Sequence, residues 1–368
     1  MSVNEFDSYR PPEQPKKRRK RRRQAAAAGD ASRRGAEGNR EMPMVPDVEA
    51  MAHDSYYGKG VVKPPPWGHE VAAYLFLGGV AGGSGLLGAG AQMSKRPKLR
   101  RNTRVIAMSA VGLGGVALVM DLGRPDRFYN MLRTFKVTSP MSVGSWILSG
   151  YAGALTVAFG ADFDRMLGER LPLGPLRKLL RLAENPAGLG AAVFAAPLAS
   201  YTGVLLSDTA VPTWNAMREG LPYVFVSSAS LAASGLAMVT TPVEECGPAR
   251  KLAVAGVIGD IAFMKWTESR MDETVKEPLH HGESGKLVTW AERLAIAGGV
   301  GTLLGGRKRP IAILSGLCLA AASAFTRFGV FEAGLHSARD PKYTIEPQRR
   351  RLAARRAAGI TDDSITTV

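Results

Sequence analysis

The 368-residue chain has few of the side chains that hold redox metals. Its two cysteines, Cys246 and Cys318, are too few for a four-thiolate iron–sulfur cluster. Intramembrane haem needs axial ligands inside the membrane helices. No histidine of this chain lies in the middle of an apolar segment; the five are His53, His69, His280, His281 and His336. We therefore expect no haem, iron–sulfur cluster or metal site in this chain.

Charge is also scarce, but only in the middle of the chain. The net charge of +16 by itself would indicate a soluble basic protein. The basic residues, however, gather at the ends: residues 1–66 carry 14 Lys/Arg and residues 331–368 carry seven. Between them, eight stretches with few or no charges are long enough to cross about 30 Å of hydrocarbon as helices. They are 69–93, 103–121, 143–161, 187–207, 221–241, 250–266, 291–305 and 310–330.

This pattern predicts an all-α polytopic membrane protein with eight transmembrane helices. The membrane domain spans 67–332, between disordered basic tails at 1–66 and 333–368. The sixth and seventh segments are the least apolar, because Lys265, Glu292 and Arg293 interrupt them. Glycines spaced four apart in the first segment predict close helix packing in lipid.

The polar segments carry weaker signals. No signal peptide is visible before the basic octamer at 16–23, which we interpret as part of a solvated tail that touches anionic lipid rather than nucleic acid. Within the loop at 162–186, the stretch 171–182 predicts a short amphipathic surface helix. A second long loop, 267–289, is polar throughout.

The positive charges of the loops and those of the tails predict opposite orientations of the chain in the membrane. The loops after the odd-numbered segments hold 16 Lys/Arg and those after the even-numbered segments hold eight, which places the odd loops inside. The two tails add 21 positive charges to the other side. Moving such a basic N-terminal arm across a membrane without a signal sequence is implausible, so we expect both termini in the cytoplasm.

A charged loop joins the second and third segments. Asp121 ends the second segment, where an ionised carboxylate in hydrocarbon costs about 2.5–3.5 kcal/mol on insertion scales. Arg124 is the nearest candidate partner. The pair predicts a functional site or a docking surface, and the alternative is a helix-end ion pair that only shapes the loop.

Five short motifs carry the most specific functional signal. They are WGHEVAAYLFLGGVAGG at 67–83, DLGRPDRF at 121–128, TSPMSVGSW at 138–146, SYTG at 200–203 and AVPTWN at 210–215. In this order, and between these segments, they resemble the NrfD family. Members of that family are membrane subunits of polysulfide reductase-like and related molybdopterin oxidoreductase complexes. The likeness runs from about 66 to 332.

The resemblance implies a subunit of two four-helix bundles in the plasma membrane that binds menaquinone or ubiquinone. It implies that electrons pass between this quinone and an iron–sulfur subunit with four clusters. That subunit docks at the membrane surface and connects to a molybdopterin catalytic subunit, as in formate dehydrogenase or polysulfide reductase complexes. In such complexes the quinone site lies in the first bundle, near the docked partner.

By motif position, the resemblance assigns quinone contacts to Tyr74 and Tyr201. Tyr74 stands in place of a histidine found in some relatives. A tyrosine can donate a hydrogen bond to a quinone carbonyl, but with a pKa near 10 it is a poor base. Without the resemblance, we would interpret Tyr201 as an aromatic residue packed in a helix bundle.

Oxidation of a quinol releases two protons, so a quinone site needs acceptors for them. We expect Glu70 and Asp121 in this role, with Arg124 holding one of them ionised. A water-exposed interfacial position is the alternative for Glu70. His69 is a candidate quinone contact, with an interfacial position again as the alternative.

Trp214 and Asn215 lie in the loop after the fourth segment, on the same membrane face as the Asp121 loop. They either roof the quinone pocket or meet the partner subunit. For Trp214 the alternative is a place in the aromatic belt at the membrane interface.

The later segments suggest a rival function. Asp260, Lys265 and Arg327 are intramembrane ionisable residues, which are functional candidates by default. They form either a proton path or a structural ion pair, and the first possibility would suit a proton or solute transporter. The inverted repeats common in transporters are not visible, since the 67–83 and 121–146 patterns have no second copy. The chain shows no soluble catalytic domain, so by itself it would react only with the quinone.

Overall fold

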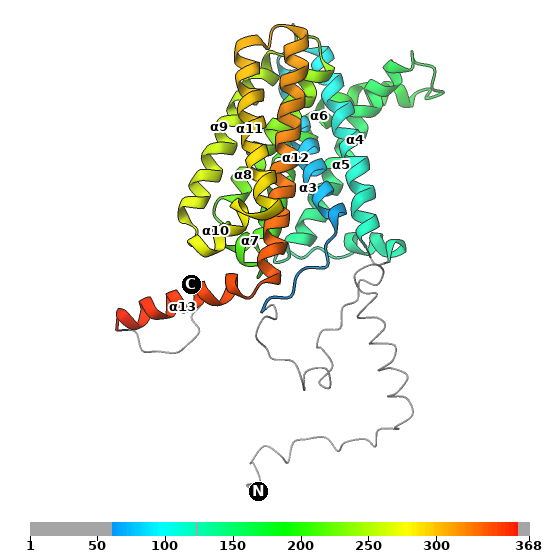
Figure 1. Cartoon of the computed structure of the whole chain (residues 1–368). Coiled ribbons are helices and arrows are strands. Elements are labelled where there is room, and N and C mark those ends of the chain that lie inside the picture. Colours follow the sequence, from blue (N-terminus) through cyan, green and yellow to red (C-terminus); the bar gives the residue numbers. More distant parts are fainter. Residues whose placement is uncertain (1–60, 123, 360–368) are drawn as a thin grey trace, which may run out of the picture. The chain divides into compact units, whose positions relative to one another are not determined.

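The computed structural model describes residues 61–122 and 124–359, and within these ranges the chain is helical without strands (Figure 1). The elements in chain order are α3 (His69–Met93), α4 (Pro97–Asp121), the 3-10 helix η2 (Pro125–Leu132), α5 (Pro140–Met166), α6 (Leu176–Ser207), α7 (Pro212–Ala216), α8 (Leu221–Thr240), α9 (Gly247–Arg270), α10 (Glu273–His280), α11 (Gly282–Gly305), α12 (Arg309–Arg339) and α13 (Lys342–Ala357). Most of the predicted N-terminal tail lies outside the described residues.

The long helices follow the eight predicted segments in order. Seven of the described helices are long and apolar enough to cross a membrane: α3, α4, α5, α6, α8, α11 and α12. The eighth long helix, α9, has 24 residues but is less apolar, because it carries Arg250, Lys251, Asp260 and Lys265. The predicted class, an all-α polytopic membrane protein, is confirmed.

Proline marks where most of these helices begin. A proline occupies the first or second helical position of α4, η2, α5, α7, α8, α9 and α12. The proline ring fixes a helical φ, and its missing N–H has no intrahelical partner at that position anyway. At α5, Ser139 adds a cap, since its hydroxyl accepts from the backbone N–H of Ser142 at 3.5 Å. The 138–146 motif therefore encodes the start of a helix.

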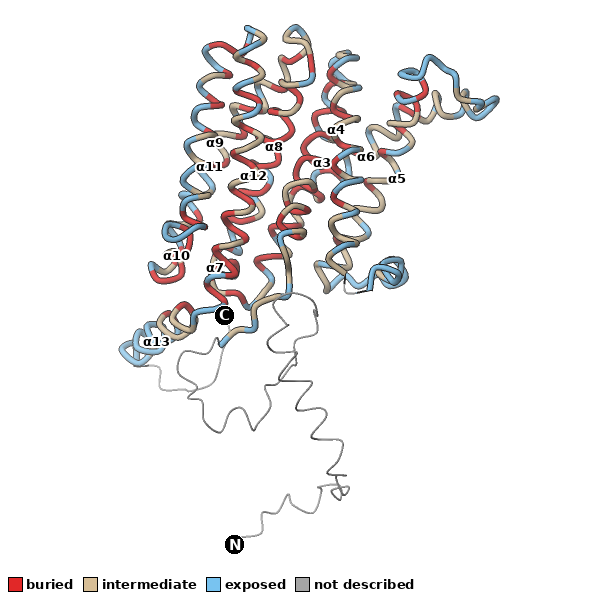
Figure 2. Tube along the Cα trace, turned by 45° about the vertical axis from the view of Figure 1, so that its right-hand side comes forward, coloured by how far each residue is buried: buried red, intermediate tan, exposed pale blue. Residues whose placement is uncertain are grey.

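The long helices pack in two groups of four. In the first bundle, α3–α6, α3 contacts α4 and α6, while α5 contacts α6. In the second bundle, α8, α9, α11 and α12, α8 contacts α9 and α12, while α11 contacts α12. The bundles share an interface, because α3 also contacts α8 and α12. Figure 2 shows the buried positions concentrated on α3, α8 and α12.

Glycine allows the closest helix approaches. A Cβ at Gly82 of α3 would lie 2.8 Å from the carbonyl oxygen of Ala195 on α6. Gly235 of α8 and Gly316 of α12 face each other so closely that a Cβ on either would overlap the other's carbonyl oxygen. These contacts agree with the packing role predicted for small residues in lipid.

The polar segments are more helical than their sequence predicts. The C-terminal boundary expected at 332 falls inside α12, and α13 occupies part of the predicted tail. The surface helix expected at 171–182 overlaps the first turns of α6, which begins at Leu176 and runs for 32 residues. Most of the loop expected at 267–289 is helical, as the end of α9, α10 and the start of α11. These segments are too polar to be recognised as membrane-spanning helices by apolar length.

Polar contacts hold α13 against α10. Lys342 Nζ lies 2.6 Å from Glu277 Oε2, and Arg350 Nη1 lies 2.8 Å from Asp272 Oδ1. Burial raises the pKa of Asp272, but hydrogen bonds from the Thr274 backbone N–H and from Arg350 outweigh it and leave this pKa below its ordinary value. These ion pairs explain why a strongly basic segment lies along α10.

Candidate functional site

The two tyrosines expected at the site lie at the same depth of the first bundle. Tyr74 is five residues from the start of α3, and Tyr201 is six residues from the end of α6. At 1.5 Å per residue, these positions are about 7 and 9 Å from the same end of the bundle. A shared hydrogen-bond partner confirms that the two tyrosines lie at the same depth. Arg327 donates to Leu75 and to Thr202, the residues that directly follow the tyrosines.

Tyr74 presents a hydrogen-bonding group inside the bundle. Its side chain is 3 % exposed, and its ring packs against α4 at Gly114, where a Cβ would lie 3.4 Å from Cδ2. Within the described residues, the buried Tyr74 hydroxyl has no hydrogen-bond partner. A buried polar group left unpaired costs about 1–3 kcal/mol. A ligand oxygen at this hydroxyl would remove that cost.

Tyr201 lies between α6 and α5. Its ring covers Gly144 of α5 so closely that an alanine Cβ there would overlap the ring. The side chain is half-buried and packs against the apolar core of the first bundle. Gly144 belongs to the 138–146 motif and Tyr201 to the 200–203 motif, so the structure brings two of the sequence motifs into contact.

Three of the expected charged residues lie nearer the end of the bundle. Glu70 stands in the first turn of α3, where the helix dipole favours a carboxylate, and its side chain folds back over Gly68. His69 is exposed, with Nδ1 3.6 Å from Glu332 Oε1 of α12. Asp121 is half-buried as the last residue of α4. All three lie about one to three turns from the level of the tyrosines.

The loop after Asp121 is an exposed surface element. Arg124 is exposed at the start of η2, and η2 packs on the ends of α4 and α5. Apolar rings lie on this surface beside the basic side chains. Phe128 meets Tyr129 edge to face at 6.3 Å, and Phe135 meets Trp146 in the same way at 6.0 Å.

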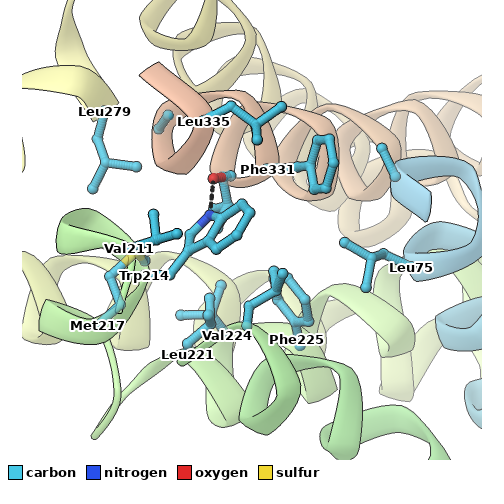
Figure 3. Close-up of a cluster of buried hydrophobic side chains, with 14 of the residues drawn as sticks. Leu75, Val211, Trp214, Met217, Leu221, Val224, Phe225, Leu279, Phe331 and Leu335 are labelled. Atoms are coloured by element: carbon cyan, nitrogen blue, oxygen red, sulfur yellow. Dashed lines mark hydrogen bonds between the residues drawn. The ribbon is translucent and has the colours of Figure 1, made fainter. Parts of the chain in front are cut away.

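Trp214 lies in the protein core. It is fully buried in α7, and its indole N–H donates to the carbonyl oxygen of Val330 at 2.8 Å (Figure 3). Its ring stacks on Trp67 at 5.9 Å and packs on Phe331 at 5.7 Å. This geometry gives Trp214 a packing role between α7 and α12, and its assignment to the cofactor site stays a prediction.

Asn215 shapes the turn after α6. Its side-chain amide donates to the carbonyl oxygens of Ser207 at 3.4 Å and Thr209 at 3.1 Å. These bonds satisfy carbonyl groups at a helix end that the helix itself cannot pair. Among the described residues, Asn215 therefore belongs with Trp214 to the scaffold around α7 rather than to the level of the tyrosines.

A polar cavity of about 80 Å³ lies in the second bundle between α9, α11 and α12. This volume holds several water molecules. Asp260 is buried at the cavity, and within the described residues its Oδ1 has no hydrogen-bond partner. Lys265 Nζ lies 3.5 Å from Glu292 Oε1, and His280 Nε2 lies 3.7 Å from Glu268 Oε1. These two pairs line the cavity together with apolar side chains such as Ile261.

Sequence reasoning misses a buried ion network at the opposite end of the first bundle. Arg104 of α4 lies 2.8 Å from Asp162 of α5 and 3.0 Å from Glu184 of α6. Arg100 and Arg165 pair with the same two carboxylates, which are almost fully buried. The clue in the sequence is that acidic and Arg side chains recur at the ends of three adjacent segments. The predicted loop at 162–186 contains both acidic residues, which the structure instead places in α5 and α6.

Comparison with known proteins gives a consistent result. Residues 60–247 match the profile of a family described as polysulphide reductase, NrfD. The sequence is 28 % identical over 173 residues to the C subunit of the polysulfide reductase of Wolinella succinogenes, covering 44 % of this protein and 54 % of that subunit.

Two further relatives carry the NrfD name. A protein NrfD homolog of Haemophilus influenzae is 30 % identical over 188 residues, covering 46 % of this chain and 57 % of the relative. Protein NrfD of Escherichia coli is 30 % identical over 198 residues, covering 49 % and 60 %. The chain thus spans between half and two thirds of the length of these relatives.

Proposed function

This chain belongs to the polysulphide reductase NrfD family, and we propose that it is the quinone-reactive membrane subunit of an oxidoreductase complex. Its partners in this proposal are a four-cluster iron–sulfur subunit and a molybdopterin catalytic subunit. It exchanges electrons between membrane menaquinone or ubiquinone and the iron–sulfur partner.

One observation carries the proposal. The buried Tyr74 hydroxyl has no hydrogen-bond partner within the described residues, and it lies at the level of Tyr201. A quinone has two carbonyl oxygens that need donors, so these hydroxyls suit its head group. When bound, a quinone supplies the reversible two-electron, two-proton chemistry that neither tyrosine can supply alone.

The remaining residues divide between proton transfer and scaffold. Glu70 and Asp121 lie between the tyrosines and the bundle end, where they can accept protons and pass them to water. Arg124, at the start of η2, is proposed to favour the ionised form of one of these carboxylates. Trp214 and Asn215 hold α7 and the end of α6, and a role for them in the quinone site stays a prediction.

The partner subunit is proposed to dock on the η2 surface. Electron transfer requires the quinone and the first cluster to be close, and η2 covers the end of the first bundle nearest the tyrosines. Exposed Phe128, Tyr129 and Phe135 beside Arg127 and Arg133 give the mixed aromatic and arginine composition typical of protein interfaces.

We further propose that this end of the protein faces the cytoplasm. The eight long helices alternate in direction, so α3 begins and α12 ends at the same end (Figure 1). Some of the positive charges at the opposite end are bonded inside the protein. Arg309 donates to the carbonyl oxygens of Met238, Val239 and Thr241, and Arg104 pairs with buried carboxylates. Arginines bonded in this way contribute less to the positive charge of the loops, which sets the orientation of a membrane protein.

Lipid extraction from the purified wild-type chain tests the quinone site directly. We expect a bound quinone, and we expect Tyr201→Phe combined with Glu70→Gln to retain at most about a tenth of it. The first change removes a hydrogen-bond donor of the site, and the second removes its nearby proton acceptor. Tyr223→Phe is the matched control, since Tyr223 is an exposed tyrosine on α8. Folded wild-type protein without any quinone would rule out the proposal.

The polar cavity favours a second function, proton translocation by the second bundle. Asp260 lines this cavity together with the His280–Glu268 pair near the bundle end. We expect Asp260→Asn to abolish proton uptake in proteoliposomes during quinone turnover, because an amide cannot bind and release a proton. Glu283→Gln, at an exposed position of the neighbouring helix, is the control. Proton uptake by Asp260→Asn at the wild-type rate would exclude this function.

A further inference from the structure

We propose that Arg327 of the second bundle is a positioning residue of the quinone site in the first bundle. It fixes the turns of α3 and α6 that carry Tyr74 and Tyr201, and its positive charge favours anionic ligands between them. This inference rests on the proposed quinone-binding function.

The Arg327 side chain reaches out of its own bundle. It is fully buried, and Nη1 donates to the carbonyl oxygen of Leu75 on α3 at 2.6 Å and to Thr202 Oγ1 on α6 at 3.4 Å. Nη2 donates to the carbonyl oxygen of Phe225 on α8 at 2.6 Å. Leu75 and Phe225 lie on facing helices of the core in Figure 3. One guanidinium therefore joins α12 to three other helices.

Its hydrogen bonds place Arg327 against the residues that follow the two tyrosines in the chain. Leu75 follows Tyr74 and Thr202 follows Tyr201 in the chain, so the same group restrains both backbone turns. The space for it comes from Gly79, one turn after Leu75, where a Cβ would overlap the guanidinium. Because the guanidinium is a rigid planar fork, it fixes the spacing of the turns in a way that the flexible Lys ammonium cannot.

The charge of Arg327 is not cancelled by its direct partners. Among the described residues, its hydrogen-bond acceptors are all neutral oxygens, including Ser228 Oγ at 3.4 Å, and it lies 4.4 Å above the Phe225 ring. Asp260 acts on it electrostatically from the second bundle. Buried arginines are usually paired with an acid. A cation held by dipoles instead retains a positive field, which a low-dielectric interior screens less than water does.

This field has a consequence for the ligand. A quinone head group held at this site would carry negative charge on its ring oxygens in its reduced form. A preorganised positive charge at the turns that carry the tyrosines favours that state over the neutral one, because the protein needs no rearrangement to meet it. The charge of Arg327 thus favours the anionic over the neutral state of the ligand, and its hydrogen bonds fix the geometry of the site.

Two probes separate these effects in the full chain, reconstituted in nanodiscs after removal of native quinone. One is a neutral naphthoquinone, and the other is a hydroxynaphthoquinone whose acidic hydroxyl is ionised at neutral pH. We expect Arg327→Gln to weaken binding of the anion by at least about tenfold and of the neutral probe by no more than about threefold. Arg327→Lys should keep the preference for the anion while weakening both probes, because it keeps the charge and loses the fork.

Ser228→Asp gives a second test that retains the guanidinium. A carboxylate at this position would lie beside Nε and neutralise the charge, so it should reduce binding of the anion selectively. Folded Arg327→Gln or Ser228→Asp protein that binds both probes with an unchanged ratio would overturn the role of the charge. Wild-type protein that binds neither probe would overturn the quinone site itself, and this inference with it.

Discussion

Replacing Gly144 with alanine is expected to lower quinone turnover by about 10²-fold while the protein stays folded. The new Cβ would overlap the Tyr201 ring, and we expect this half-buried ring to move aside while α5 and α6 stay packed. A displacement of about 1 Å at a reacting group can cost about 10²-fold in rate. The measurement is the steady-state rate of quinol oxidation by the purified complex, with the Tm of each variant determined in parallel.

Gly153→Ala on the same helix provides the control for this prediction. A Cβ at Gly153 has no neighbour within 4 Å, so only helix propensity changes, by about 1 kcal/mol in favour of alanine. We expect wild-type turnover from Gly153→Ala. If Gly144→Ala also turned over quinol at the wild-type rate, the position of Tyr201 would be irrelevant to catalysis, and Tyr201 would leave the proposed site.

Replacing Glu184 with glutamine is expected to destabilise the fold by about 3–5 kcal/mol, the usual cost of breaking a buried ion pair. Glu184 accepts from Arg104 and Arg165 and lies 3.1 Å from Arg100. The amide would leave three guanidinium groups facing one remaining carboxylate, that of Asp162. The free energy of unfolding, measured by denaturant titration in mixed micelles, is the readout.

An exposed ion pair serves as the reference for that loss. Glu283 and Lys286 are 2.8 Å apart, but both side chains are largely exposed. Exposed pairs contribute little, so Glu283→Gln should leave the free energy of unfolding nearly unchanged. Equal stability of Glu184→Gln and wild type would show that the network at α4, α5 and α6 is dispensable for folding.

Much of the fold could be predicted because membrane-spanning helices are recognised by length and apolar composition. All eight predicted segments are long helices, and even the prediction that the sixth is among the weakest corresponds to α9, the long helix too charged to qualify as a span. The polar helices were not predictable in this way. The helix α13 has no apolar face of its own, and the ion pairs of Lys342 and Arg350 hold it against α10.

The site could be predicted only in part. Sequence motifs indicated Tyr74 and Tyr201, and the structure places both at one depth of the first bundle, although it leaves their function as a proposal. The same motifs also indicated Trp214, whose ring and N–H are used within the core. A motif shows that a residue matters but not whether it packs or binds, because both roles favour a large aromatic side chain.

The sequence by itself determined the eight long helices and their order, since apolar length and proline positions act within each segment. It also determined the family, through five motifs whose order needs no structure. Only the tertiary structure decided which segments meet. It brings Gly144 into contact with the Tyr201 ring and three arginines into contact with two buried carboxylates. It also bonds Arg327 to the residues that follow both tyrosines. These contacts join residues up to 252 positions apart. Side-chain packing between helices sets such distances, and no local pattern in the chain encodes them.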